Sequence, residues 1–179
     1  KRVGGAVDEF YGEYWNMEEN SWPWLKDFHN LIITRTFSKA YGLAGLRVGY
    51  SLSHPEVADL INRVRQPFNV SHLAQAAAVA ALGDEAYLQQ SRDVNEAGMK
   101  QFIAGFEKMG LQYIPSRANF ITVNVHTNAF EVYDELLYEG VIVRPVANYG
   151  LPQHLRVSIG LAEENQRFLD ALSTILGRG

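Results

Sequence analysis

The chain has 179 residues, of which 47% are hydrophobic and 20% charged, and its formal net charge at pH 7 is -4. This apolar content allows a sizeable core in one or two domains, and a mildly negative chain without a basic block argues against nucleic acid as the main partner. The chain has no cysteine and its five histidines lack metal-ligand spacing, so we expect neither disulfides nor a metal site. No apolar run approaches the roughly 20 residues of a membrane span, and no leader pattern opens the chain. We therefore expect a cytoplasmic protein.

The first half of the chain has the pattern of an α/β domain. Short apolar runs predict buried strands, and capping residues followed by helix-forming residues predict helices. His54 or Ser53 can cap one helix, with Pro55 at its first position, and Asp84 can cap a long one. The predicted elements are, in chain order, strands over residues 31–33 and 46–52 and helices over residues 55–65, 71–82 and 85–109.

The order of elements changes in the second half. Strands are joined there partly directly and partly through helices, which is typical of a small α+β domain with its helices on one face. The predicted strands cover residues 111–114, 119–125, 141–144 and 155–159, and the predicted helices cover residues 130–138 and 163–176. We expect the domain boundary to fall within the long helix that precedes these strands.

One lysine, Lys39, lies in a loop of small residues between the two apolar runs of the first half. Residues 36–50 have the sequence TFSKAYGLAGLRVGY, whose serine and glycines let backbone and ligand approach closely. We expect Lys39 at a sheet's edge, beside Ser38 and within reach of Arg47. A partly desolvated lysine can condense with an aldehyde, and a hydroxyl with a guanidinium suits a phosphate, so these groups indicate pyridoxal phosphate. The alternative is a solvated loop lysine beside an ordinary glycine turn.

This segment resembles the Schiff-base motif of the fold-type I pyridoxal-phosphate aminotransferases, and its sequence is most similar to that of the histidinol-phosphate aminotransferases. The resemblance implies that Lys39 forms the Schiff base with the cofactor and that Ser38 and Arg47 bind the cofactor phosphate. It also implies the fold. Residues 1–90 would be the C-terminal part of a large cofactor-binding domain with a mostly parallel sheet, and residues 91–179 the small α+β domain.

A second cluster precedes the lysine. Asp8 ends a short apolar run, and Tyr11 follows three residues later. A carboxylate at that depth can pair with a protonated pyridine nitrogen, and a phenol can hydrogen-bond the 3-oxygen of the ring. The family pattern is Asp-Glu-Ala-Tyr, in which Phe10 here replaces the alanine, and the resemblance assigns Asp8 and Tyr11 to these two roles. The alternative is a strand end or a solvated acidic turn.

A third cluster contains two arginines near the C-terminus. Arg156 interrupts an otherwise apolar predicted strand, and a buried guanidinium is costly unless an anion meets it. Its planar fork suits a carboxylate, and in the resembling family this arginine binds the substrate carboxylate. Arg144 lies at a strand end where histidinol-phosphate enzymes meet the substrate phosphate, although a surface ion pair would also explain it. Histidinol phosphate has no carboxylate, so the division of roles between Arg144 and Arg156 stays open.

The resemblance implies transamination of histidinol phosphate with 2-oxoglutarate and glutamate, in histidine biosynthesis, by a homodimer. Threonine-phosphate decarboxylases and other amino-acid aminotransferases share much of this pattern and stay open as alternatives. The family's glycine-containing phosphate turn, ring-stacking aromatic residue and asparagine for the 3-oxygen have no counterpart here, which predicts that the chain is the C-terminal half of such an enzyme. Another reading is a catalytically incompetent dimerising fragment, because residues 66–71 resemble the loop that reaches the neighbouring subunit's cofactor.

Overall fold

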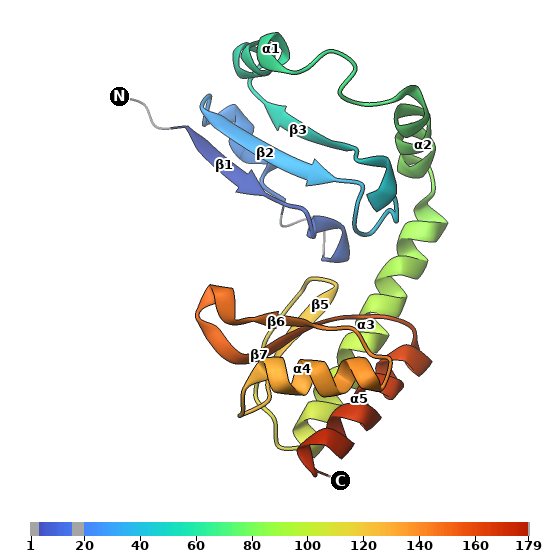
Figure 1. Ribbon diagram of the computed structural model, residues 1–179. Helices are drawn as coiled ribbons and strands as arrows, with labels where there is room; N and C mark the ends of the chain where they lie inside the picture. Colours follow the sequence, from blue (N-terminus) through green and yellow to red (C-terminus); the bar gives the residue numbers. More distant parts are fainter. Residues whose placement is uncertain (1–3, 16–19, 179) are drawn as a thin grey trace. The chain divides into compact units, whose positions relative to one another are not determined.

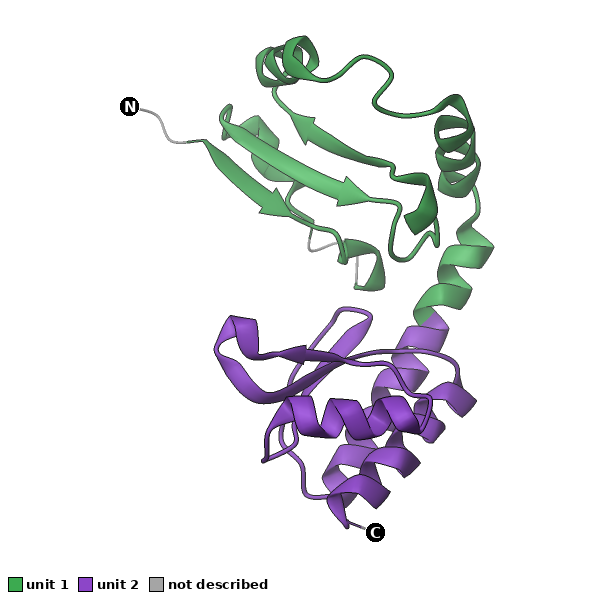
Figure 2. Ribbon diagram, in the orientation of Figure 1, with its two compact units in different colours: residues 1–92 green, residues 93–179 purple. Residues whose placement is uncertain are grey.

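The computed structural model describes residues 4–15 and 20–178 of the chain (Figure 1). The chain divides into two compact units, residues 1–92 and residues 93–179 (Figure 2). Each unit has its own sheet, and helices accompany both, which confirms the prediction of a mixed helix and sheet fold. Within the described residues, no helix is both long enough and apolar enough to cross a membrane.

The sheet of the first unit has the strand order β1-β2-β3. Its strands are β1 (Gly5–Asp8), β2 (Leu31–Thr36) and β3 (Gly49–Ser53). β1 runs parallel to β2, and β3 runs antiparallel to it. β3 begins later than predicted because Ala44–Leu46 forms a 3₁₀ turn and Arg47 then has left-handed backbone angles, with φ of 53°. Other 3₁₀ turns span Gly12–Tyr14, Trp22–Lys26 and Ala147–Tyr149.

The predicted helices are present, and His54 and Asp84 bond at their starts as expected, whereas Ser71 caps the helix in which it was predicted to lie. The helices of the first unit are α1 (Pro55–Val64), α2 (His72–Leu82) and α3 (Glu85–Lys108), the last of which continues into the second unit. His54 Nδ1 accepts from Glu56 N at the start of α1, and Ser71 Oγ accepts from Ala74 N (3.2 Å) at the start of α2. Asp84 Oδ1 accepts a hydrogen bond at the start of α3. These bonds satisfy backbone donors that a helix start leaves unpaired.

The second unit contains an antiparallel sheet with the order β4-β5-β7-β6. Its elements are β4 (Tyr113–Ile114), β5 (Phe120–Asn124), α4 (Ala129–Tyr138), β6 (Arg144–Val146), β7 (Leu151–Ser158) and α5 (Ala162–Leu176). β6 begins only at Arg144, at the end of the range predicted for this strand. The residues before it close α4, because Val141 N donates to the carbonyl of Leu136 (2.8 Å) and Gly140 has φ of 72°.

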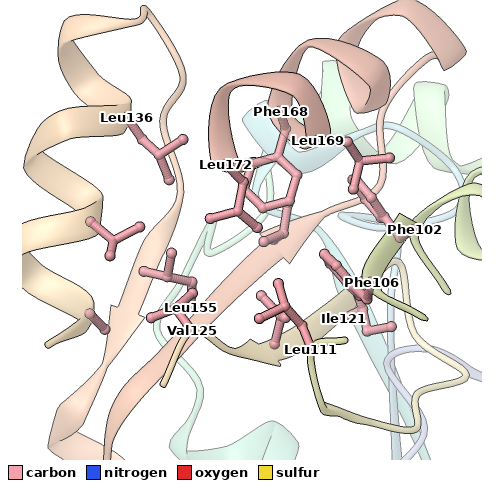
Figure 3. Close-up of a cluster of buried hydrophobic side chains, with 14 residues drawn as sticks. Phe102, Phe106, Leu111, Ile121, Val125, Leu136, Leu155, Phe168, Leu169 and Leu172 are labelled. Carbon is pink, nitrogen blue, oxygen red and sulfur yellow. The ribbon is translucent and has the colours of Figure 1, made fainter. Parts of the chain in front are cut away.

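A hydrophobic core joins the helices of the second unit to its sheet (Figure 3). The Phe168 ring of α5 contacts two rings of α3 edge to face, with centroids 5.6 Å from Phe102 and 6.3 Å from Phe106. The sheet contributes the buried residues of alternate positions, Ile121 and Val123 on β5 and their counterparts on β7. The intervening side chains of β5 and β7 therefore lie on the opposite face of the sheet.

Candidate active site

The candidate cofactor residues of the first unit lie at one edge of its sheet. Asp8 is the last residue of β1, and Ser38 follows shortly after β2. These strands are parallel, so their C-terminal ends share an edge. Arg47 precedes β3, whose first residue Gly49 pairs with Thr36 at the end of β2, so the antiparallel strand starts at this same edge. The C-terminal ends of parallel strands are where α/β proteins bind their ligands.

Lys39 is half-buried in the loop that follows β2. Its Nζ lies 5.4 Å from the centre of the Tyr11 ring, so the fold brings these two predicted site residues together. The loop turns tightly, because Gly42 N donates to the carbonyl of Lys39 (2.9 Å). Gly42 has φ of +70°, so the conformation of the turn favours glycine, and an added Cβ would lie 2.5 Å from the Tyr87 hydroxyl and displace it.

The other three predicted cofactor residues have few protein contacts. Asp8 is exposed, which differs from the carboxylate at depth that the sequence predicted, and its Oδ1 accepts from Phe10 N (2.9 Å). Ser38 is half-buried, and Arg47 is exposed with its Nη1 donating to the carbonyl of Ala44 (2.8 Å). Among the described residues, no ion pair engages Asp8, Lys39 or Arg47. Their charged groups are therefore available to a ligand.

The two candidate substrate arginines are direct neighbours in the second sheet. Arg144 of β6 pairs with Arg156 of β7, and residues paired in this way project from the same face. This face is opposite to the core, because Leu155 and Val157, on either side of Arg156, are buried in the core. The premise that Arg156 is buried in an apolar strand is therefore wrong. Strand alternation places it on the other side of the sheet.

The surroundings of these arginines favour an anion. Arg156 is half-buried, with its Cζ 4.2 Å from the centre of the Phe120 ring, and Arg144 is exposed. Within the described residues, neither arginine forms an ion pair with a carboxylate. Two guanidinium groups on one face of neighbouring strands repel each other unless an anion lies between them. A carboxylate or phosphate would relieve that repulsion and accept bidentate hydrogen bonds.

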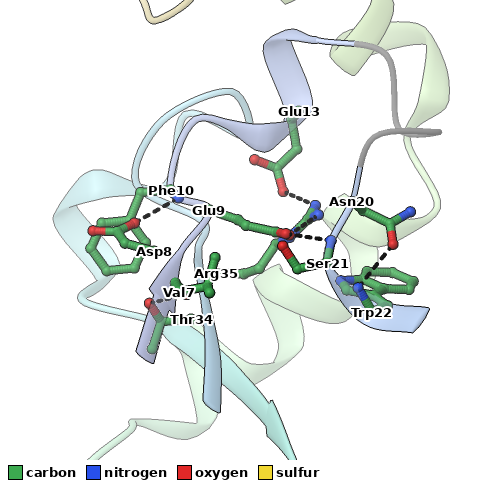
Figure 4. A network of polar contacts seen from close by, with 10 residues as sticks. All are labelled: Val7, Asp8, Glu9, Phe10, Glu13, Asn20, Ser21, Trp22, Thr34 and Arg35. Atoms are coloured by element: carbon green, nitrogen blue, oxygen red, sulfur yellow. Dashed lines mark hydrogen bonds and ion pairs between the residues drawn. The ribbon is translucent and has the colours of Figure 1, made fainter. Parts of the chain in front are cut away.

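A buried ion network was missed by the sequence reasoning (Figure 4). Arg35 of β2 donates through Nε and Nη2 to Glu9 Oε2, and through Nη1 to Glu13 Oε1 (3.0 Å). Glu9 also accepts from Ser21 N through Oε1 (2.7 Å). One signal was present in the sequence, because Arg35 takes the position of a buried residue in the alternation of β2. The sequence did not indicate which residues pair with Arg35, because Glu9 and Glu13 lie far from it along the chain.

Electrostatic effects favour the charged forms of Glu9 and Arg35 in this network. Burial alone would raise the pKa of Glu9, but hydrogen bonds from Ser21 and Arg35 outweigh burial, and the pKa lies below its ordinary value of 4.5. Burial likewise opposes the charge of Arg35, yet the two carboxylates raise its pKa above the ordinary value. Burial raises the pKa of the nearby Tyr41 phenol above its ordinary value, and the Glu13 charge adds to the effect.

The donor set at the edge of the first sheet fits an aldehyde that carries a phosphate. A lysine amine, a serine hydroxyl, an arginine guanidinium and a carboxylate are the groups that such a molecule with a basic ring nitrogen requires. Among the described residues, no cluster of three or more His, Cys, Asp or Glu side chains could hold a metal ion. The lysine amine of this donor set is suited to chemistry on the aldehyde of an organic cofactor.

Comparison with known proteins matches the chain to a family of aminotransferases. The model of the family described as aminotransferase class I and II matches residues 6–172. Histidinol-phosphate aminotransferase 2 of Pseudomonas fluorescens is 60% identical over 178 residues, which make up 97% of this chain and 48% of that protein. Histidinol-phosphate aminotransferase 1 of Nitrosococcus oceani is 57% identical, with 96% of this chain and 47% of that protein covered. The chain thus spans about half the length of the curated relatives it matches.

Solved structures also resemble the chain over nearly its whole length, at lower sequence identity. Histidinol-phosphate aminotransferase from Sinorhizobium meliloti, in complex with pyridoxal-5'-phosphate, has a TM-score of 0.84 at 32% identity, covering 96% of this chain and 48% of its own. L-Threonine-O-3-phosphate decarboxylase from Porphyromonas gingivalis has a TM-score of 0.85 at 26% identity, covering 96% of this chain and 55% of its own. The backbone is therefore common to transaminating and decarboxylating relatives.

Proposed function

The chain belongs to the aminotransferase class I and II family, and from this membership we propose that it carries the C-terminal half of a pyridoxal-phosphate-dependent histidinol-phosphate aminotransferase. The observation that carries the proposal is the approach of the Lys39 amine to the Tyr11 ring, at the edge where the parallel strands β1 and β2 end. The identity of 60% and 57% to two proteins named for this activity supports the choice of substrate.

Each site residue has a separate task in this proposal. When bound, pyridoxal phosphate supplies an aldehyde for amine exchange and a ring that withdraws electrons. Lys39 binds the aldehyde and moves a proton at its Nζ, and Asp8 holds the proton on the ring nitrogen. The Tyr11 hydroxyl donates to the 3-oxygen of the ring. Ser38 and Arg47 hold the cofactor phosphate.

The arginine pair of the second unit binds the substrates. Arg156 receives the carboxylate of glutamate or 2-oxoglutarate, and Arg144 receives the phosphate of histidinol phosphate. Their places on one face of neighbouring strands support this assignment, because the two substrates then meet the same positively charged surface in turn. In the proposed reaction, histidinol phosphate first gives up its amine and 2-oxoglutarate then accepts it, so two different anions occupy the site in succession.

The proposal includes two domains, an assembly and a location. The first unit is part of the large cofactor-binding domain, and the second is the small domain. The enzyme is a cytoplasmic homodimer without nucleic acid or membrane partners. The loop before α2 supports the dimer, because Phe68 is 94% exposed and has φ of 56°, a conformation unusual for a bulky residue. Measuring the mass of the full-length enzyme in solution tests the assembly.

A direct assay tests the activity. The full-length enzyme, loaded with pyridoxal phosphate, is incubated with histidinol phosphate and 2-oxoglutarate, and glutamate formation is followed. We expect one glutamate for each histidinol phosphate consumed. Threonine phosphate is supplied in a parallel reaction in which carbon dioxide is measured. Absence of amino transfer, or faster release of carbon dioxide from threonine phosphate, would overturn the assignment in favour of the decarboxylating relatives.

A further inference from the structure

Arg35 has no task in the chemistry above, yet its guanidinium joins the two segments that carry the candidate cofactor residues. It lies on β2, four residues before Lys39. Its two acceptors, Glu9 and Glu13, belong to the other segment and flank Tyr11 in sequence. One planar side chain therefore connects the strand that leads to Lys39 with the turn that carries Tyr11 (Figure 4).

The network is enclosed on several sides. The side chains of Arg35 and Glu13 are 2% and 1% exposed. The Trp22 ring lies 5.1 Å from the Arg35 Cζ. A Cβ added to Gly12 would come within 3.3 Å of the guanidinium, so a side chain there would press on it. The guanidinium thus has little freedom to move, and the groups it contacts are held in one geometry.

Further bonds extend from the network to neighbouring segments. Ser21 N donates to Glu9 Oε1 (2.7 Å), and Arg92 Nε donates to the carbonyl of Glu13 (2.6 Å). Both carboxylate residues are therefore held from two directions. Tyr11 lies between Glu9 and Glu13 in sequence, so the segment that carries its ring is anchored on both sides.

Stability alone is a poor explanation for a network in which two charges are buried and the third, that of Glu9, is on a side chain only 11% exposed. Replacing a buried ion network by apolar side chains of similar volume is often neutral or stabilising. Apolar side chains, however, do not fix orientation in the way that a five-donor fork does when it addresses two carboxylates. The carboxylates of Glu9 and Glu13 alternate in sequence with the candidate ligands Asp8 and Tyr11, so fixing the former orients the latter.

We infer that Arg35, acting through Glu9 and Glu13, is a positioning residue that holds Asp8 and Tyr11 in register with Lys39 for the pyridoxal phosphate ring. This inference rests on the proposed function. Displacement of reacting groups by about 1 Å can cost on the order of 10²-fold in rate. Loss of the Arg35 contacts should therefore weaken cofactor binding and slow turnover, while leaving the substrate arginines undisturbed.

The test compares four variants of the full-length enzyme with the wild type. Arg35→Met removes the charge, Arg35→Lys keeps the charge without the fork, and Glu9→Gln weakens one acceptor with little change in shape. Arg63→Met is the matched control, because Arg63 forms an exposed ion pair with Asp59. The measurements are the dissociation constant of pyridoxal phosphate for the apoenzyme, kcat, KM for glutamate, the absorbance of bound cofactor against pH, and the thermal midpoint.

For Arg35→Met we expect cofactor binding about 10-fold weaker and kcat lower by about 10²-fold, with KM for glutamate changed less than about 3-fold. The pH at which the cofactor absorbance changes should also move, because Asp8 and Tyr11 contact the ring. Arg35→Lys should recover part of both losses, and Arg63→Met should match the wild type. If Arg35→Met does not fold, Glu9→Gln should show the same pattern with smaller changes.

Two results would overturn the inference. A lower thermal midpoint with unchanged cofactor affinity, kcat and absorbance profile in Arg35→Met, or in Glu9→Gln where the former does not fold, would mean that the network only stabilises the fold. A wild-type enzyme that binds no pyridoxal phosphate would overturn the proposed function itself, and this inference with it. The wild-type titration separates the second case from the first.

Discussion

Arg35 in the first unit and Arg156 in the second both lie on interior strands of their sheets, but their partners differ. Arg35 is enclosed and bound by two carboxylates. Arg156 has an aromatic ring beside it and Arg144 opposite it, and no ion pair among the described residues. The fold has thus neutralised one cation and left the others available. A paired cation organises structure, and an unpaired cation beside another one favours an anionic ligand.

The same distinction separates the cations of the first unit. Arg35 is paired, whereas Lys39 and Arg47 have no ion pair among the described residues, although all three belong to the same sheet and the loop after it. We therefore expect variants of the unpaired cations to remove contacts with the ligand directly, whereas variants of the paired cations should act through the geometry of the site or through stability.

The largest effect is expected for Lys39→Ala in the full-length enzyme. Removal of the amine that binds the cofactor aldehyde should lower kcat by roughly 10³-fold or more, because loss of a reacting side chain removes a whole catalytic step. The thermal midpoint of the apoenzyme should stay near the wild-type value, since Lys39 makes no ion pair with the residues that the structure describes. Lys26→Ala, which changes an exposed lysine in the 3₁₀ turn Trp22–Lys26, is the control. Near-normal turnover in Lys39→Ala would show that another residue binds the aldehyde.

The next effect concerns the arginine pair. Arg156→Ala should raise KM for 2-oxoglutarate by about 10- to 100-fold, because a charge-assisted hydrogen bond is worth roughly 1.5–3 kcal/mol. The stability loss should stay below about 2 kcal/mol, because a cation-π contact contributes from about 0.5 kcal/mol at exposed sites to about 2 kcal/mol when it is desolvated. Arg144→Ala should instead raise KM for histidinol phosphate more than KM for 2-oxoglutarate. Steady-state kinetics with both substrates checks this, and unchanged KM values in both variants would contradict the assignment.

A smaller effect on stability is expected when acid protonates Glu9, one of the two carboxylates paired with Arg35. The pKa of Glu9 is lowered in the folded protein, so its ionised form contributes stability that is complete above the unfolded pKa near 4.5 and is lost as pH falls towards the lower folded pKa. The thermal midpoint of the full-length enzyme should therefore decrease below pH 4.5. Glu9→Gln should decrease less steeply over the same range. If the thermal midpoints of the two proteins decrease equally steeply with falling pH, protonation of Glu9 does not affect stability.

The smallest effect is expected for the exposed ion pair of α1. The side chains of Arg63 and Asp59 are 69% and 55% exposed, and pairs of this kind in helices contribute roughly 0.3–0.5 kcal/mol. Arg63→Ala should change the free energy of unfolding by no more than that, and added salt should reduce the difference further. Chemical denaturation at two salt concentrations measures it. A loss above about 1 kcal/mol would show that an ion pair can contribute strongly to stability even when both of its side chains are exposed.

Several elements could be predicted because their signals are local. The caps of α1, α2 and α3 lie within a few residues of the bonds they make, and the periodic patterns of α4 and α5 are contained within each helix. The loop around Lys39 could also be identified, because its small residues and its lysine adjoin in sequence. By contrast, the start of β6 was predicted too early, since the backbone before it is engaged in closing α4.

The sequence by itself determined the order of the elements, the chemistry-bearing residue types and the resemblance to an aminotransferase half. Only the tertiary structure decided which of those residues meet. It paired Arg35 with Glu9 and Glu13, placed Lys39 5.4 Å from the Tyr11 ring, and set Arg144 opposite Arg156 on the face away from the core. The physical reason is that caps and periodicity depend on near neighbours along the chain, whereas strand register and buried ion pairs depend on how distant segments pack together.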